Sequence, residues 1–164
     1  MSESPSIHPH GAMRRKEREI ADRGEIEAIL REGTVMRIAL VDGDIPFLVP
    51  VFYVFDGGSV YFHSAKVGTK MRILAKNPNI CFEVSLDQGV VEADAACDFE
   101  ARHRTAIGWG KAVSVEDESG KIRILDLLVA KFTERKFEYP QAMLSHTAVT
   151  RVEIVSLKGK KHGV

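Results

Sequence analysis

The spacing of apolar residues along this chain changes several times, and each change predicts a new element. The first pattern is a helical stripe, made by Ile26, Ile29 and Leu30 and ended by Gly33. From residue 34 the period becomes two, with apolar residues at Met36, Ile38 and Leu40 before an Asp42-Gly43 turn. These patterns predict a helix followed by a strand that buries one of its faces.

The segment 45–65 is predicted to form two strands joined by Asp56, Gly57 and Gly58, a strong hairpin signal. Both faces of residues 47–55 are apolar, so we expect this strand to be covered on two sides. A short helix follows over residues 68–78, with a predicted buried stripe of Met71, Leu74 and Ala75.

The second half of the chain continues with strands and one long helix. Residues 79–87 alternate cleanly, with Ile80, Phe82, Val84 and Leu86 on one face. The acidic segment 88–100 has little periodicity and is predicted to be a loop, either a solvated excursion or a lid. A strand over 103–117, a helix over 118–137 with a stripe of Ile122, Leu125, Leu128 and Val129, and a closing strand over 147–161 complete the prediction.

Mostly antiparallel strands with a few helices predict a mainly β fold, a small β-barrel with peripheral helices. Residues 1–12 are polar and are expected to be a disordered tail, whereas residues 13–164 form a single domain. A chain of 164 residues, 45% of them apolar, suits one domain with a real core.

The charge balance limits the function classes. Lys+Arg and Asp+Glu both number 23, so the chain offers no electrostatic case for nucleic acid or an anionic membrane as its main partner. Charged residues interrupt every apolar run, and the N-terminus lacks a signal pattern, so a cytoplasmic protein is expected. Cys81 and Cys97 are too few for a disulfide framework or a thiolate metal site and are read as reduced thiols; no metal site is predicted.

The junction between the second hairpin strand and the short helix carries the candidate chemistry. Here the strand ends in hydroxyl and imidazole groups and the helix opens with a lysine, in the residues His63, Ser64, Ala65, Thr69 and Lys70. A helix N-terminus offers free N–H groups and a favourable dipole to a phosphate, and the nearby ammonium adds a full charge. The alternative is an ordinary strand–turn–helix with a capping Thr69, a surface Lys70 and a half-buried His63.

A second feature lies on the strand over 103–117. Gly108, Gly110 and Ala112 alternate on one face, which leaves room for something flat to lie close to the backbone. Trp109, on the other face, could cover a planar ligand or simply pack in the core or in an interface.

Several separated segments, in the right order, resemble one known superfamily. The run from Pro46 to Val84 followed by "RHRTAIGWGKAVSVED" is similar to the FMN-binding split barrels of the pyridoxamine 5′-phosphate oxidase type. More narrowly, "MRRKEREI", "YFHSAKVGTK" and "LKGKK" resemble the nitroimidazole reductase or nitroimidazole-resistance branch. The resemblance covers about residues 13–161 and implies an antiparallel, six-stranded Greek-key barrel.

The resemblance also implies a cofactor and its binding residues. In such proteins the FMN phosphate lies against the positions of Ser64, Ala65, Thr69 and Lys70, with His63 as a further ligand or a catalytic residue. The backbone of Val49, Pro50 and Val51 runs along the flavin. The fold is typically a homodimer with the cofactor at the interface, so the partner's strand would complete the site with its residues at positions Arg102, Arg104 and Trp109.

The implied function is an FMN-dependent oxidoreductase that reduces small planar electrophiles such as nitroimidazoles. No nucleotide-binding glycine fingerprint occurs, so NAD(P)H would bind transiently over the flavin. Many relatives carry Arg-Tyr where this chain has Arg102-His103, and basic residues for a vitamin B6 phosphate are not evident near the C-terminus. The alternatives are a non-catalytic barrel that holds flavin or haem for storage or sensing, and a purely structural dimer.

Overall fold

Two glycine turns fold the first half of the barrel. Gly43 (φ 63°), Gly57 (φ 55°) and Gly58 (φ 79°) adopt left-handed conformations that residues with a side chain rarely reach. They join β2 (Val35–Asp42), β3 (Ile45–Asp56) and β4 (Ser59–Ala65) into an antiparallel meander. Both hairpins predicted from the sequence are therefore confirmed.

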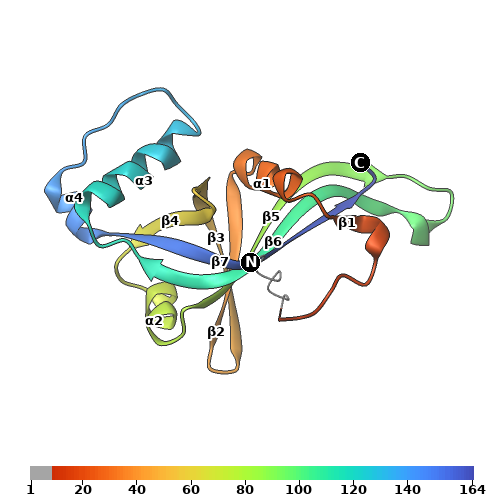
Figure 1. Ribbon diagram of the computed structural model, residues 1–164, viewed down its shortest axis with the longest axis horizontal. Coiled ribbons are helices and arrows are strands. Elements are labelled where there is room, and N and C mark those ends of the chain that lie inside the picture. The colour runs from red at the N-terminus through yellow and green to blue at the C-terminus, as the bar shows by residue number, and fades with distance from the viewer. Residues whose placement is uncertain (1–8) are drawn as a thin grey trace, which may run out of the picture.

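The computed structural model describes residues 9–164 (Figure 1). The predicted tail over residues 1–12 falls largely on residues 1–8, which lie outside the described part of the chain. The remaining elements are η1 (Lys16–Arg18), β1 (Glu19–Ile20), α1 (Arg23–Glu32), α2 (Thr69–Lys76), β5 (Asn79–Val91), η2 (Ala96–Asp98), β6 (Glu100–Ser114), α3 (Glu118–Ala130), α4 (Gln141–His146) and β7 (Thr147–His162).

Six strands close into a barrel in which every pairing is antiparallel. The order β7-β4-β3-β2-β5-β6 returns to its start because β6 also pairs with β7, while β1 adds a two-residue strand to the far end of β7. The chain crosses from β4 to β5 through α2 (Figure 1). The mainly β class and the six-stranded barrel expected from the resemblance are confirmed.

The core follows the predicted periodicities. The alternating residues of β2 and β5 and the stripe of α1 are buried: Ile26, Ile29, Leu30, Met36, Ile38, Leu40, Ile80, Phe82 and Val84. Asp22 begins α1 by accepting a hydrogen bond from the Glu25 amide at 2.7 Å, and Gly33 ends it. At Gly33 an added Cβ would lie 2.3 Å from Val84 Cγ1, so only glycine fits this close approach.

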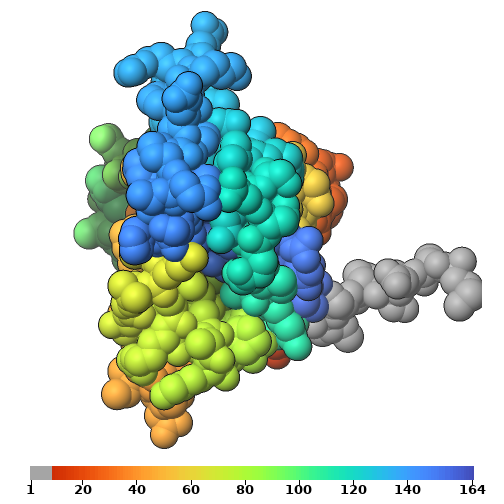
Figure 2. Space-filling model, turned by 90° about the vertical axis from the view of Figure 1, so that its left-hand side faces the viewer, coloured from red at the N-terminus to blue at the C-terminus, as the bar shows by residue number. Residues whose placement is uncertain are grey.

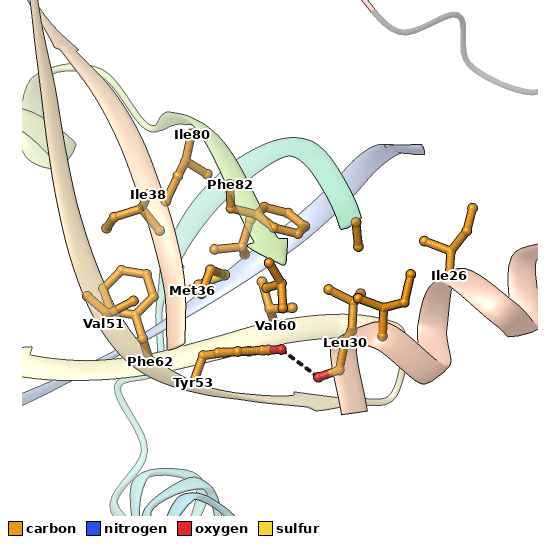
Figure 3. Close-up of a cluster of buried hydrophobic side chains, with 14 of the residues drawn as sticks. Ile26, Leu30, Met36, Ile38, Val51, Tyr53, Val60, Phe62, Ile80 and Phe82 are labelled. Atoms are coloured by element: carbon orange, nitrogen blue, oxygen red, sulfur yellow. Dashed lines mark hydrogen bonds between the residues drawn. The ribbon is translucent and has the colours of Figure 1, made fainter. Parts of the chain in front are cut away.

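Tyr53 ties the barrel to α1 (Figure 3). Its side chain is fully buried, and its hydroxyl donates to the Leu30 carbonyl at 2.7 Å. Burial raises the pKa of the phenol, so the hydroxyl stays protonated and remains a donor. The carbonyl is one of those that the end of a helix leaves without an intrahelical partner, and Tyr53 supplies one.

A second apolar cluster lies between α3, α4 and the strands β3, β4 and β7. Its buried members are Val54, Tyr61, Ile124, Leu125, Leu128, Leu144 and Val149. Asp117 begins α3 by accepting from the Gly120 amide at 2.7 Å. The helices α3 and α4 therefore stand beside one side of the barrel (Figure 1).

Several element boundaries differ from those predicted. Strand β5 continues through a bulge after Asp87 to Val91, and β6 already begins at Glu100, so the predicted loop 88–100 shrinks to residues 92–99. Helix α3 ends at Ala130 rather than near 137, and α4 was not predicted. The closing strand predicted over 147–161 extends one residue further, to His162.

Three predicted burial patterns also need correction. In α2 the fully buried residue is Ile73, whereas Ala75 is exposed; in α3 Ile124 is buried, while Ile122 and Val129 are only partly so. The shifts arise because each short helix packs against a curved sheet at an angle that the helical period does not specify. Strand β3 is not covered on both sides within this chain: Leu48 and Phe52 are 66% and 57% exposed.

We predict that Tyr53→Phe lowers the free energy of unfolding by about 1–2 kcal/mol, because the buried Leu30 carbonyl loses its donor. Urea unfolding followed by circular dichroism measures the change. The matched control is Tyr139→Phe, whose hydroxyl bonds Asp126 at the surface and should matter by less than about 0.5 kcal/mol. Equal losses in the two variants would contradict the structural role of the Tyr53 hydroxyl.

Candidate functional site

The barrel is open between β3 and β4. Strand β3 pairs with β2 from Ile45 to Phe52, but with β4 only from Tyr53 to Asp56. Strand β4 meanwhile continues along β7 as far as Ala65. Beyond Tyr53 the two strands diverge, and no described strand pairs with the facing edges of residues 45–52 and 63–65. We call this opening the split.

The split exposes backbone groups that a closed sheet would pair. An unpaired strand edge presents N–H and C=O groups that need a partner, whether another strand, water or a ligand. Extending the register of the last pair, Tyr53 with Phe62, puts Val51 level with Ser64. The two segments singled out in the sequence, residues 49–51 and 63–65, thus form the two walls of one opening.

The N-terminus of α2 lies just beyond the end of β4. Gly68 is the residue before the helix, with φ 117° and open space where a Cβ would project. No side chain caps α2, in contrast to the aspartates that cap α1 and α3. Thr69 is the first helical residue and does not act as a cap, so the ordinary capping interpretation of this junction is wrong.

Ser64 and Lys70 gather on the inner side of β4. The Ser64 hydroxyl donates to the Ala65 carbonyl at 3.0 Å and lies 3.4 Å from Met71 Sδ. Lys70 Nζ lies 5.4 Å from the centroid of the buried Phe62 ring. Burial lowers the pKa of the Lys70 ammonium. The structure therefore brings a hydroxyl and a cation together beside the free amides of α2.

His63 lies on the other face of β4, with Ala65 and the Tyr61 ring. Its surface remains exposed, yet burial lowers the pKa of its imidazole, and the nearby Lys70 charge lowers it further. An imidazole with a lowered pKa stays neutral at pH 7 and can donate or accept one hydrogen bond on each nitrogen.

The β3 wall has an alternating character. The side chain of Val51 is buried and that of Val49 half-buried, whereas Pro50 points outward with Leu48 and Phe52 and is exposed. Because a proline has no N–H, it fits at an edge that pairs on one side only. Phe132, which follows α3, packs against Phe52 edge to face at 5.7 Å.

The three candidates on β6 are not brought to the split of the same chain. Arg104 and Trp109 pair with the far part of β7, at Lys161 and Ser156, whereas the split adjoins the first residues of β7. They also divide between two faces. Arg102 and Arg104 alternate with Trp109, and Arg104 is paired with Glu32 of α1 at 3.1 Å. Trp109 is half-buried on the outer face, opposite Cys81 in the register.

The small residues of β6 do not leave room for a flat ligand. An added Cβ at Gly108 would meet the Phe82 ring at 2.0 Å, and one at Gly110 would meet the Glu153 carbonyl oxygen at 2.2 Å. The expected space is therefore filled by the protein's own phenylalanine and by the adjacent strand. This prediction is corrected: the face with the glycines is part of the core.

Sequence reasoning missed Lys131, which fixes the apex of the split. Its Nζ donates to the Gly33 carbonyl at 2.5 Å and to the Tyr53 carbonyl at 3.2 Å, and lies 4.4 Å from the Tyr53 ring centroid. Burial lowers the pKa of this ammonium. A lysine at the end of a predicted helix gives no sign that it reaches carbonyls 78 and 98 positions away.

Residues 22–161 match the family model for pyridoxamine 5′-phosphate oxidase. The chain belongs to this family. No curated protein matches it.

Solved structures of the pyridoxamine 5′-phosphate oxidase fold extend the comparison. A candidate 5-nitroimidazole antibiotic resistance protein from Bacteroides thetaiotaomicron is 26% identical, with a TM-score of 0.77 over 87% of this chain and 85% of that one. The flavocytochrome Anf3 from Azotobacter vinelandii is 25% identical, with a TM-score of 0.84 over 94% and 73%. The FAD- and haem-binding protein from Mycobacterium smegmatis, 21% identical with a TM-score of 0.82 over 90% and 74%, shares the fold.

Among residues 9–164, no group of three His, Cys, Asp or Glu side chains is placed to hold a metal ion. No helix in the same range is long and apolar enough to span a bilayer. Cys81 and Cys97 are both free thiols, and burial raises the pKa of Cys81.

We predict that Lys70→Gln raises the pKa of His63, because it removes the nearby positive charge. In the folded wild type the imidazole is protonated only below the unfolded pKa of about 6.5. Folding stability is therefore lost as pH falls from about 6.5 through the lowered folded pKa, and the variant should lose less stability over this range. An NMR titration of the His63 ring measures the shift. Lys76→Gln, at the other end of α2, is the control, and an unchanged His63 pKa in Lys70→Gln contradicts the contact.

Proposed function

We propose that the split binds flavin mononucleotide and that the protein is an FMN-dependent oxidoreductase for small electrophilic aromatics, with electrons from NAD(P)H. The observation that carries this proposal is the meeting of two unpaired strand edges with an uncapped helix N-terminus. The unpaired strand edges suit the polar rim of a flat ring, and the N-terminus of α2 suits a phosphate.

The phosphate end is the better defined. In this proposal the free amides at the start of α2, the Ser64 hydroxyl and the Lys70 ammonium hold the phosphate. Gly68 would let the backbone approach because nothing lies within 4 Å of its Cβ position. Charge-assisted hydrogen bonds of this kind are stronger than neutral ones, so Lys70 should dominate the affinity.

The ring end relies on the β3 wall. The edge of residues 49–51 offers main-chain donors and acceptors to the polar rim of the flavin, whose bound ring supplies reversible uptake and delivery of electrons. His63, neutral at pH 7, would then donate a hydrogen bond that orients the substrate rather than transfer a proton to it. Its place on the wall of the split, next to Ser64 and level with Phe52 when the register is extended, supports that positioning role.

The similarity to a candidate nitroimidazole-resistance protein supports a small nitroaromatic substrate. The similarity to a flavocytochrome favours a second candidate, a non-catalytic barrel that holds flavin or haem. An absorbance spectrum of the purified protein distinguishes the ligands, since haem gives a Soret band. Steady NADPH oxidation with a nitroimidazole acceptor would exclude the non-catalytic alternative, and a colourless protein that takes up no FMN would exclude both.

We further propose a homodimer. Within one chain the split is open, since His63, Ala65 and Thr69 are exposed along it. The outward face of β2 and β3 beside it is apolar, with Val41, Leu48 and Phe52 between 48% and 66% exposed. Adjacent apolar side chains on this scale are typical of an interface, and a second copy could cover both the face and the split.

We predict that Lys70→Ala weakens FMN binding about 10- to 100-fold while riboflavin binding changes little, because only FMN carries the phosphate. Quenching of flavin fluorescence measures both affinities. Lys76→Ala, on the same helix but away from its N-terminus, should leave both unchanged. Equal effects of Lys70→Ala on FMN and riboflavin would contradict the phosphate site.

We also predict that Leu48→Glu converts the dimer to a monomer and lowers FMN affinity at the same time, because it buries a carboxylate in the apolar face. Light scattering gives the mass and fluorescence the affinity. The control is Val90→Glu. Val90 is exposed to a similar extent as Leu48, but it lies near the end of β5 and not on β3. A dimer that survives Leu48→Glu with normal FMN binding would show that this face is not the interface.

A further inference from the structure

A second cationic region lies at the other end of β7 from the split. A cavity of about 330 Å³ is lined by Met13, Arg14, Arg15, Arg18, Glu100 and Lys160, which we call the basic pocket. Strand β1 brings these residues together, because Glu19 pairs with Lys160 and so carries the arginine-rich segment onto the end of the barrel. The start of β6 contributes Glu100.

The basic pocket has four cations and one carboxylate, and that carboxylate is already fully engaged. Arg18 donates to both oxygens of Glu100, at 2.8 and 2.6 Å, and His162 contacts one of them. Arg15 remains 3.8 Å from Glu100, beyond hydrogen-bonding distance. Within residues 9–164, Arg14 and Lys160 form no ion pair, so two of the four cations face the cavity without an acidic partner, and Arg15 has only its distant contact with Glu100.

Neighbouring basic residues behave differently. Lys16 pairs with Glu19 at 3.0 Å, Lys161 pairs with Glu25 at 3.2 Å, and Lys158 donates to the Gly11 carbonyl. Arg14 and Lys160 thus lack the acidic or carbonyl partner that these neighbours have.

The lowered pKa values of two neighbouring groups, Glu100 and His103, are consistent with a positive potential in the basic pocket. The hydrogen bond from Arg18, assisted by the charges of His162 and Arg15, lowers the pKa of Glu100. The pKa of His103 is lowered first by burial and then by the charges of Lys160, His162 and Arg18. Like charges held this close repel one another, and a bound anion would relieve that repulsion.

We propose that the basic pocket binds the phosphate group of a phosphorylated small molecule. Planar guanidinium groups match phosphate oxygens with paired N–H donors, which favours phosphate over a spherical anion. At about 330 Å³ the cavity reaches the size of small-molecule pockets, which start near roughly 300 Å³, and Met13 supplies an apolar contact beside the cations. Free inorganic phosphate would leave much of this space empty.

This site is separate from the proposed flavin site. The split adjoins the first residues of β7, where Thr147 pairs with Ala65, whereas Lys160 lies thirteen residues further along the strand. At about 3.3 Å per residue the two regions of one chain are roughly 40 Å apart along β7. The inference therefore holds whether or not flavin binds at the split.

The test is calorimetric titration of the full chain at low salt with adenosine 5′-monophosphate, inorganic phosphate and adenosine. We expect the monophosphate to bind, phosphate to bind at least tenfold more weakly, and adenosine not to bind. Arg14→Gln and Lys160→Gln should each weaken monophosphate binding about tenfold. Lys16→Gln is the matched control, since Lys16 lies in the same segment but pairs with Glu19 outside the cavity.

Other outcomes overturn the proposal. Equal affinity for monophosphate and inorganic phosphate would mean that only the anion is bound. An equal loss in Lys16→Gln would mean that the effect is one of general charge. The titration is repeated with Lys70→Ala to test whether the monophosphate occupies the split: retained binding assigns it to the basic pocket, and lost binding assigns it to the split.

Discussion

Tyr53 and Phe62 form the last pair between β3 and β4, and the position of Tyr53 is fixed from several directions. Its hydroxyl is bonded to the end of α1, its carbonyl accepts from Lys131 at the end of α3, and the same ammonium lies over its ring. Burying an ammonium is costly unless carbonyls surround it, and Lys131 finds two. The end of α1 and the end of α3 thus both contact Tyr53, the residue at which β3 leaves β4. These contacts explain why the split begins at this residue.

The split has a cost that one chain does not recover. It leaves strand edges unpaired, and on the same strand it leaves Leu48 and Phe52 more than half exposed. An isolated chain would hydrate the free edge and keep the apolar face in water, both unfavourable relative to a closed sheet. A ligand on the edge and a second chain on the face would offset the two costs separately, which is why we treat cofactor binding and dimerisation as linked but distinguishable.

Local patterns predicted the strands and the two hairpins well, but not the point at which β3 stops pairing with β4. Alternation in β2 and β5 and the glycine turns at Gly43 and Gly57 are properties of a few consecutive residues, so the sequence was sufficient for them. Where β3 stops pairing with β4 depends on Lys131, far along the chain, and no short pattern contains that contact. The glycines of β6 show the converse error: small residues on one face indicate a close neighbour, but not whether that neighbour is a ligand or, as here, Phe82.

The placement of the lysines near the C-terminus bears on the proposed substrate. Near the C-terminus, Lys158 donates to the Gly11 carbonyl and Lys161 donates to Glu25. These two lysines therefore bind earlier parts of the chain and are not free to bind a substrate. Lys160 alone of the three faces a cavity, and that cavity lies at the far end of β7 from the split. None of these three lysines is therefore placed at the split of its own chain. This placement supports the proposed substrate, a neutral planar electrophile, over a phosphorylated one, and the barrel shared across the family leaves that choice to a few side chains.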